Sequence, residues 1–121
     1  MKQTFIITTL VFLLCACTAN TSDLPNDITT ESYIFSCEDK GVIKVLYTMN
    51  GTEATLDISL PALKINKETL HFYQAVSASG ARYINEENNT VTYEWHTKAN
   101  YGHINMTSGT YNNFSVSCQL Q

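Results

Sequence analysis

The sequence predicts an all-β domain, a small antiparallel β-barrel of about eight strands, and three observations support this. The chain has 121 residues, enough for one small domain. Apolar and polar residues alternate with a period of two in several segments, which is typical of half-buried strands. Thr, Asn and Tyr are frequent while only 15% of residues are charged, so a helix bundle is disfavoured.

The strands follow from this alternation and from the turns between them. Alternation is clearest at residues 53–60, 90–96 and 114–118. Asn50-Gly51 joins the first of these to residues 42–49, and both turn residues tolerate the positive φ of a type I′ hairpin turn. The remaining strands are expected at 33–37, 70–75, 80–85 and 101–106.

The first residues indicate export and lipid attachment. Residues 5–14 form an apolar run behind Lys2, too short to span a bilayer but long enough for a secretory signal. Leu14-Cys15-Ala16-Cys17 resembles the lipobox of bacterial lipoproteins. We therefore expect a signal peptide at 1–16, removal of Cys15, and lipid, including palmitate, on Cys17. An ordinary signal peptide is the alternative.

The predicted domain organisation is a lipidated cysteine with a flexible tether at 17–31 and a barrel domain at 32–121. The tether has no hydrophobic periodicity. Thr18 stands where Asp retains similar lipoproteins at the inner membrane, so the outer membrane, facing the periplasm, is favoured. Removing residues 1–16 takes away Lys2 and no acid, which changes the net charge from −4 to −5. This charge excludes nucleic acid as a partner and favours a cationic one.

Two cysteines remain in the expected mature domain. Cys37 and Cys118 would meet an oxidising environment, so we expect a disulfide between the first and last strands; two free buried thiols are the alternative. Together with the scattered histidines, these cysteines do not give the spacing of a metal site. No metal and no cofactor are expected.

Enzymatic catalysis has little support in the sequence. No nucleophile elbow, zinc-protease motif, P-loop or dinucleotide-binding turn is present. Glu86 and Glu87 are adjacent acids beside Asn88-Asn89, which is more typical of a solvated turn than of a glycosidase pair. His96 lies on the polar face of its strand without a nearby nucleophile. We therefore expect a binding protein rather than an enzyme.

The segment 77–99 is the most informative part of the chain. Its small residues, ending in Ser79-Gly80, permit a tight loop that exposes hydroxyl groups. A two-residue turn at Asn88-Asn89 would set Ser79 opposite Lys98.

A loop of different length gives a second register. It sets Tyr83 opposite Tyr93 and turns Arg82 away from the core, and we favour it for that reason. In both registers Ser79 and Lys98 are directly opposite each other or offset by one residue position.

The loop residues resemble a known family. Ser79-Gly80-Ala81-Arg82-Tyr83 matches the S-G-x-x-Y motif of the membrane-bound and periplasmic inhibitors of c-type lysozyme. Residues 93–98 match the same family's Y-x-x-x-T-K-G motif, with Ala99 in place of the last glycine. The cysteine arrangement and the lipobox also fit. The resemblance implies an eight-stranded barrel that inserts two loops into the catalytic cleft of a host c-type lysozyme, a cationic protein.

The resemblance also implies the binding residues. Ser79 would give its hydroxyl to a catalytic carboxyl group, and Lys98 would place its ammonium against the negative charge of the cleft. The other residues would shape the loops. The full expected lysozyme-binding set is Ser79, Gly80, Tyr83, Tyr93, Thr97 and Lys98. Ala99 disfavours positive φ, so the second loop would be reshaped if the family uses that conformation there.

Two other functions are kept as alternatives. An envelope lipoprotein acting as a structural or protein-interaction module could use the same barrel, and Ser79 and Lys98 would then be dispensable. A carrier for a small apolar ligand would need an accessible interior. The sequence instead suggests a filled core, formed by Phe35, Leu56, Ile58, Phe72, Trp95, Ile104 and Phe114.

Overall fold

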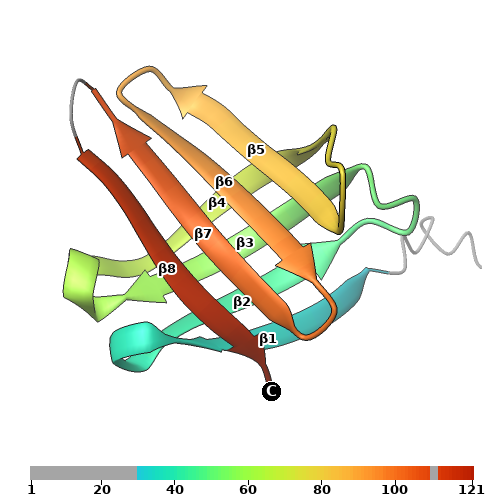
Figure 1. Ribbon diagram of the computed structural model, residues 1–121, viewed down its shortest axis with the longest axis horizontal. Coiled ribbons are helices and arrows are strands. Elements are labelled where there is room, and N and C mark those ends of the chain that lie inside the picture. Colours follow the sequence, from blue (N-terminus) through green and yellow to red (C-terminus); the bar gives the residue numbers. More distant parts are fainter. Residues whose placement is uncertain (1–29, 110–111) are drawn as a thin grey trace, which may run out of the picture.

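The chain forms a closed antiparallel barrel in which each strand pairs with the next and the last returns to the first (Figure 1). The computed structural model describes residues 30–109 and 112–121. The strands are β1 (Glu31–Cys37), β2 (Gly41–Tyr47), β3 (Glu53–Leu60), β4 (Ile65–Ala75), β5 (Ala81–Asn88), β6 (Val91–Lys98), β7 (Tyr101–Ser108) and β8 (Asn112–Leu120). The predicted barrel is therefore confirmed.

The connections between strands are short. Two 3-10 turns, η1 (Glu38–Lys40) and η2 (Pro61–Leu63), are the only helical segments among the described residues. In that part of the chain no helix is long and apolar enough to cross a membrane. The predicted signal peptide and lipidated Cys17 lie outside the described residues, and β1 begins at Glu31, the last position of the predicted tether.

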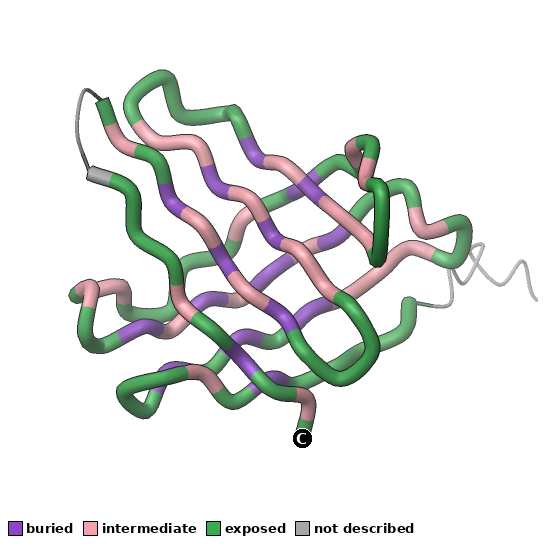
Figure 2. Tube along the Cα trace, viewed as in Figure 1, coloured by how far each residue is buried: buried purple, intermediate pink, exposed green. Residues whose placement is uncertain are grey.

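The core follows the alternation seen in the sequence (Figure 2). In β3 every second residue is buried, from Ala54 to Leu60. The predicted core residues are buried except Phe114, which is 46% exposed and corrects that prediction. Phe114 pairs with Met106 of β7, but β1 covers β8 only from Cys118 onward, so one side of the Phe114 ring lacks a neighbouring strand.

Aromatic side chains fill the centre of the barrel. Trp95 is fully buried and meets Phe35 edge-on, with ring centroids 5.1 Å apart. Its indole N–H donates a hydrogen bond to the Tyr47 hydroxyl at 3.0 Å. Phe72 is fully buried as well. A filled interior favours the predicted packed core over the carrier alternative, which needs accessible space inside the barrel.

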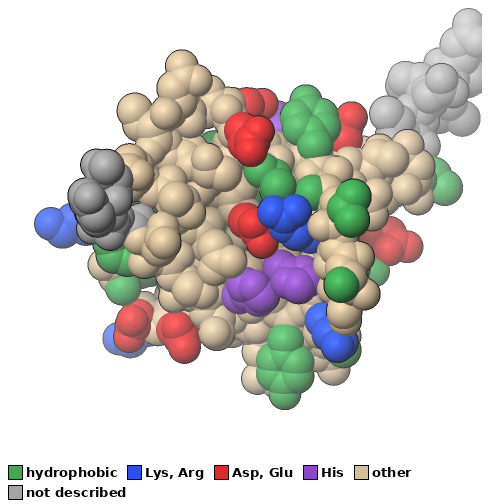
Figure 3. All heavy atoms as spheres, turned by 45° about the horizontal axis from the view of Figure 1, so that its top comes forward, with side chains coloured by type: hydrophobic (Ala, Val, Ile, Leu, Met, Phe, Trp, Pro, Cys, Tyr) green, Lys and Arg blue, Asp and Glu red, His purple; other side chains and the backbone are tan. Residues whose placement is uncertain are grey.

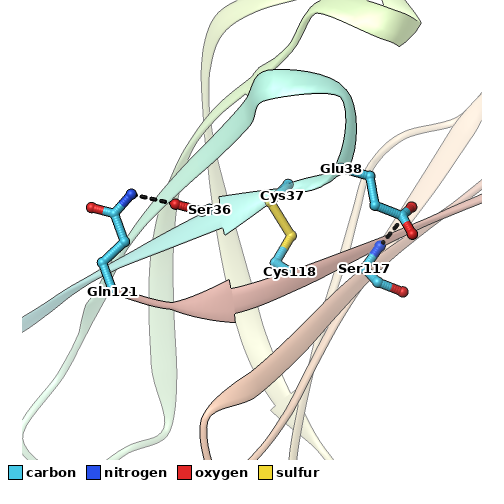
Figure 4. Close-up of a disulfide and its surroundings, with 6 residues drawn as sticks. All are labelled: Ser36, Cys37, Glu38, Ser117, Cys118 and Gln121. Carbon is cyan, nitrogen blue, oxygen red and sulfur yellow. Dashed lines mark hydrogen bonds between the residues drawn. A yellow bond between two sulfur atoms is a disulfide. The ribbon is translucent and has the colours of Figure 1, made fainter.

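The barrel closes through a short seam between β1 and β8. Only three residue pairs form this ladder. Cys37 and Cys118 lie opposite each other in it and form a disulfide across the seam (Figure 4). Beside the disulfide, the Gln121 side-chain amide donates a hydrogen bond to the Ser36 hydroxyl. The predicted disulfide between the first and last strands is confirmed.

The turn between β2 and β3 differs from the predicted type I′ turn. Gly51 has a φ of +67°, whereas Asn50 does not have a positive φ. The Thr48 N–H bonds to the Glu53 carbonyl at 3.1 Å, so four residues rather than two separate the paired positions. The Asn50 Oδ1 explains the longer loop, because it accepts hydrogen bonds from the hydroxyls of Thr48 and Thr52 at 2.9 and 2.8 Å.

The turn between β5 and β6 also differs from the prediction. Asn88 pairs with Val91, so the turn residues are Asn89 and Thr90 rather than Asn88-Asn89. The Asn88 Oδ1 accepts hydrogen bonds from the Thr90 N–H and hydroxyl at 2.9 and 2.6 Å, which stabilises this turn. An irregularity in the ladder lies between Asn85 and Asn88.

The resulting register is one that neither prediction gave. Tyr83 lies opposite Trp95 rather than opposite Tyr93. The favoured register differs from the observed one by two positions, and a shift of two leaves every side chain on the same face. Arg82 therefore lies on the outer face, as the favoured register required.

The two ends of the barrel carry different segments (Figure 1). One end holds the connections at residues 48–52, 76–80 and 99–100, and we call it the loop end. The start of β1 and the end of β8 lie at the same end, because strand direction alternates around the barrel. The opposite end holds η1, η2 and the β5–β6 turn.

Candidate functional site

The two motif segments meet at the loop end. Ala81 lies opposite Thr97 in the β5–β6 ladder, so Gly80 stands beside Lys98. Gly80 has a φ of +71°, and a Cβ at this position would lie 2.2 Å from the Thr97 carbonyl oxygen and 3.2 Å from the Lys98 Cβ. The backbones of the two segments are thus in direct contact, and only glycine permits this contact.

Ser79 and Lys98 lie close together, and their side chains have no polar partner among the described residues. Both residues are exposed, and Ser79 is one position beyond Gly80. Ser79 is therefore offset from Lys98 by one residue position across the hairpin, within the range that both predicted registers required. Among the described residues, no group forms a hydrogen bond with the Ser79 hydroxyl or an ion pair with the Lys98 ammonium. Two polar donors at the loop end are thus available to a partner.

Tyr83 and Thr97 support the loop end from within. The Tyr83 hydroxyl donates a hydrogen bond to the Gly51 carbonyl at 2.9 Å, which ties β5 to the β2–β3 loop. Thr97 is half-buried and contributes its carbonyl to the contact with Gly80. These two predicted residues therefore shape the loop end.

The structure does not bring Tyr93 to the loop end. Tyr93 is buried opposite Asn85 and Met106, and with Leu63 and Val91 it lines a hollow at the opposite end of the barrel. It belongs to the same motif as Lys98, but its side chain is part of the core.

A hollow of about 390 Å³ opens at the loop end, beside both motif segments. Tyr47 lies between Tyr33 and Tyr83 in its wall, with ring centroids 5.8 and 5.4 Å away. Burial raises the pKa of Tyr47 and of Tyr83, so both phenols are neutral at physiological pH. Glu31 is the only charged residue among the described residues that line the hollow.

Side chains on the outer face hold the β4–β5 loop in place. Arg82 pairs with Glu94 at 3.0 Å, and this hydrogen bond holds the pKa of the Glu94 carboxyl below its usual value. The same guanidinium donates a second hydrogen bond to the Val76 carbonyl at 3.3 Å. A neighbouring pair holds the other side of the loop, because the His96 Nε2 lies 2.8 Å from the Ser79 carbonyl oxygen and 3.3 Å from the Ser77 hydroxyl.

Sequence reasoning missed this support. It treated His96 as a weak general base and Ser77 only as a small loop residue. Only the observed register could have revealed both, because it sets His96 opposite Arg82, directly after the β4–β5 loop. The predicted registers set other residues there.

The acidic residues considered for catalysis lie elsewhere. Glu86 and Glu87 are exposed near the end of β5 that is opposite to Ser79 and Lys98. Within residues 30–109 and 112–121, no group of three or more His, Cys, Asp or Glu side chains could hold a metal ion.

Both motif segments lie within a stretch of the chain that matches a known protein family. A family model described as membrane-bound lysozyme-inhibitor of c-type lysozyme matches residues 35–113, which include both motif segments. The chain belongs to this family. Comparison with curated proteins and with solved structures gave no significant match. The description of the lysozyme-inhibitor family names c-type lysozyme as the target of its members and a membrane as their location.

Ala99 is the point at which this chain departs from the motif of the lysozyme-inhibitor family. Ala99 and Asn100 form a two-residue turn, because Lys98 pairs with Tyr101. Ala99 has a φ of +51°, a region that favours glycine. The turn is fastened to β8 by a hydrogen bond from the Leu120 N–H to the Asn100 carbonyl at 2.8 Å. Alanine thus occupies the left-handed conformation here instead of reshaping the loop.

Replacing Ala99 by glycine should raise the free energy of unfolding by about 1 kcal/mol, because glycine removes the strain of a positive φ. Urea denaturation of the wild-type and Ala99→Gly proteins measures this difference.

Ala78→Gly provides the matched control in the neighbouring loop. Ala78 is exposed and has no positive φ, so glycine there only adds freedom to the unfolded chain. The free energy of unfolding should fall by about 0.4–1 kcal/mol. Equal losses in both variants would contradict the strain at Ala99.

Proposed function

We propose that this protein inhibits c-type lysozyme by inserting the β4–β5 loop and the β6–β7 turn into the catalytic cleft of the enzyme. Membership of the lysozyme-inhibitor family supports the target. The observation that carries the mechanism is the contact between the two motif segments, which sets the Ser79 hydroxyl near the Lys98 ammonium. Neither group has a partner within residues 30–109 and 112–121.

The chemistry of these two groups suits the cleft of a lysozyme. The enzyme cleaves glycosidic bonds with a protonated Glu as acid and an ionised Asp as nucleophile. The Ser79 hydroxyl can donate a hydrogen bond to one catalytic carboxyl group. The Lys98 ammonium supplies a charge-assisted bond to the other. Both carboxyl groups are then occupied, and substrate is excluded from the cleft.

Rigidity and charge support tight and rapid association. The Gly80 contact and the outer-face hydrogen bonds fix both loops before binding, so little conformational entropy is lost on docking. The expected mature chain, without Lys2, has a net charge of −5 instead of −4. This charge steers association with a cationic lysozyme.

The location we propose is the outer membrane, with the barrel held in the periplasm by lipid on Cys17. The lipobox at residues 14–17 supports lipid attachment, and the family description supports a membrane location. Residues 17–31 would then act as the tether.

The test compares lysozyme turnover of bacterial cell walls in the presence of wild-type residues 18–121 and of the Ser79→Ala/Lys98→Ala variant. Two hydrogen bonds are lost and the one from the Lys98 ammonium is charge-assisted, so the double variant should inhibit roughly a hundredfold less well, or worse. Its denaturation curve should match that of the wild type, because neither side chain has an internal partner among the described residues.

A second double variant controls for the change in charge and in hydroxyl content. Lys44→Ala/Ser115→Ala removes the same two groups from exposed positions on β2 and β8. It should inhibit like the wild type. If both double variants inhibit like the wild type, Ser79 and Lys98 are dispensable and the proposed loop insertion is wrong. If the wild type itself does not inhibit, the protein-interaction alternative gains support.

A further inference from the structure

His96 reaches from the outer face of β6 to the loop that carries Ser79. Its Nε2 lies 2.8 Å from the Ser79 carbonyl oxygen. A carbonyl oxygen can only accept, so this nitrogen must carry the hydrogen. The His96 ring is half-buried, whereas Ser79 is exposed, so the bond joins the wall of the barrel to a surface loop.

Ser77 completes the arrangement around the Ser79 backbone. The Ser77 hydroxyl donates to the Ser79 carbonyl at 2.7 Å and accepts from the Ser79 N–H at 3.4 Å. The same hydroxyl lies 3.3 Å from the His96 Nε2. Both backbone polar groups of Ser79 are thus held, whereas its hydroxyl has no partner in the part of the chain that the structure describes.

His96 is one of several polar side chains gathered on this face of the barrel (Figure 3). Two histidine side chains lie together on this face beside a basic and an acidic group. His103 on β7 meets the His96 ring with centroids 5.0 Å apart, but its ring makes no hydrogen bond to the loop. Arg82 on β5 reaches the Val76 carbonyl and pairs with Glu94. His96 is therefore the residue of this group that contacts Ser79.

We propose that His96 is a positioning residue for lysozyme inhibition: its Nε2–H holds the Ser79 carbonyl and so presets the direction in which the Ser79 hydroxyl is presented. This inference rests on the proposed function. A loop that had to be ordered during docking would lose conformational entropy at that moment, and the hydrogen bond from His96 removes that loss.

The first test compares two phenylalanine variants in the cell-wall assay. His96→Phe keeps a ring against His103 but loses the donor, and should weaken inhibition by roughly tenfold. His103→Phe changes the same ring contact without touching the loop, and should inhibit within about twofold of the wild type. Equal inhibition by the wild type and His96→Phe, or equal losses in the two variants, overturns the proposal.

A conservative variant separates positioning from packing. Gln places an amide N–H at a reach similar to that of the His96 Nε2, so His96→Gln should recover most of the inhibition lost in His96→Phe. Failure of His96→Gln to inhibit better than His96→Phe would overturn the role of the hydrogen bond.

A measurement without lysozyme makes this inference independent of the proposed function. Nitrogen-15 NMR of the wild-type protein should show the hydrogen on the His96 Nε2. Amide hydrogen exchange at Ser79 and Gly80 should be faster in His96→Phe than in His103→Phe. If the wild type fails to inhibit, the proposed function fails, whereas unchanged exchange in His96→Phe overturns the positioning role itself.

Discussion

Replacing Gly80 by alanine should abolish lysozyme inhibition while leaving a folded barrel. The new Cβ would lie 2.2 Å from the Thr97 carbonyl oxygen, a backbone atom that cannot move without displacing the end of β6. The β4–β5 loop must then move away from Lys98, which separates the Ser79 hydroxyl from the ammonium. A displacement of about 1 Å can cost a factor of about a hundred in a precisely placed site, so we expect inhibition to fall at least this far.

Gly109→Ala is the matched control for this prediction. Gly109 also has a positive φ, +49°, but no atom of the described residues lies within 4 Å of the position of an added Cβ. Both variants therefore incur the backbone penalty, about 1–2 kcal/mol in unfolding free energy. Only Gly80→Ala adds the clash. Inhibition assays and urea denaturation of both variants check the prediction, which fails if Gly80→Ala inhibits as well as Gly109→Ala.

Removing the disulfide should have the largest effect on stability. Cys37 and Cys118 are separated by 81 positions in the sequence, and closing a loop of this length is worth about 4–5 kcal/mol in the chain-entropy model. Small domains have free energies of unfolding of about 5–15 kcal/mol, so the loss is a large share of the total. The β1–β8 ladder has only three residue pairs to hold the seam without it.

The measurement is urea denaturation of the Cys37→Ala/Cys118→Ala variant and of the wild type with and without a reductant. The variant and the reduced wild type should show the same lowered midpoint. The seam is formed by β1 and β8, whereas Ser79 and Lys98 lie beside β5 and β6, so the folded variant should still inhibit lysozyme. A midpoint equal to that of the oxidised wild type would contradict the prediction.

The barrel could be predicted from the sequence because strand alternation reports directly which face is buried. Residues 53–60 alternate without interruption, and the observed β3 has the same bounds. Turn chemistry was less informative, because Asn side chains accept hydrogen bonds inside the loops. Asn50 and Asn88 both do so, and each produces a turn other than the one predicted.

The candidate site could be predicted only in part. Both predicted hairpin registers set Ser79 and Lys98 close together, and the observed register, with Gly80 beside Lys98, does so as well. Tyr93 shares a motif with Lys98, but strand direction carries its side chain into the core near the opposite end. His96 escaped prediction because its role depends on a register that the Asn88-Asn89 dipeptide did not reveal.

The start of β1 has a consequence for the orientation of an anchored protein. Glu31 lines the same hollow as Ala81 and Thr97, so the chain enters the barrel at the end that carries the β4–β5 loop and the β6–β7 turn. With lipid on Cys17, that end would face the bilayer. A bound enzyme would need room between barrel and lipid, and a small domain is about 30 Å across. The residues between Cys17 and Glu31 can span about 45 Å when extended. The length of this segment therefore limits the space in which a membrane-anchored inhibitor can bind its target.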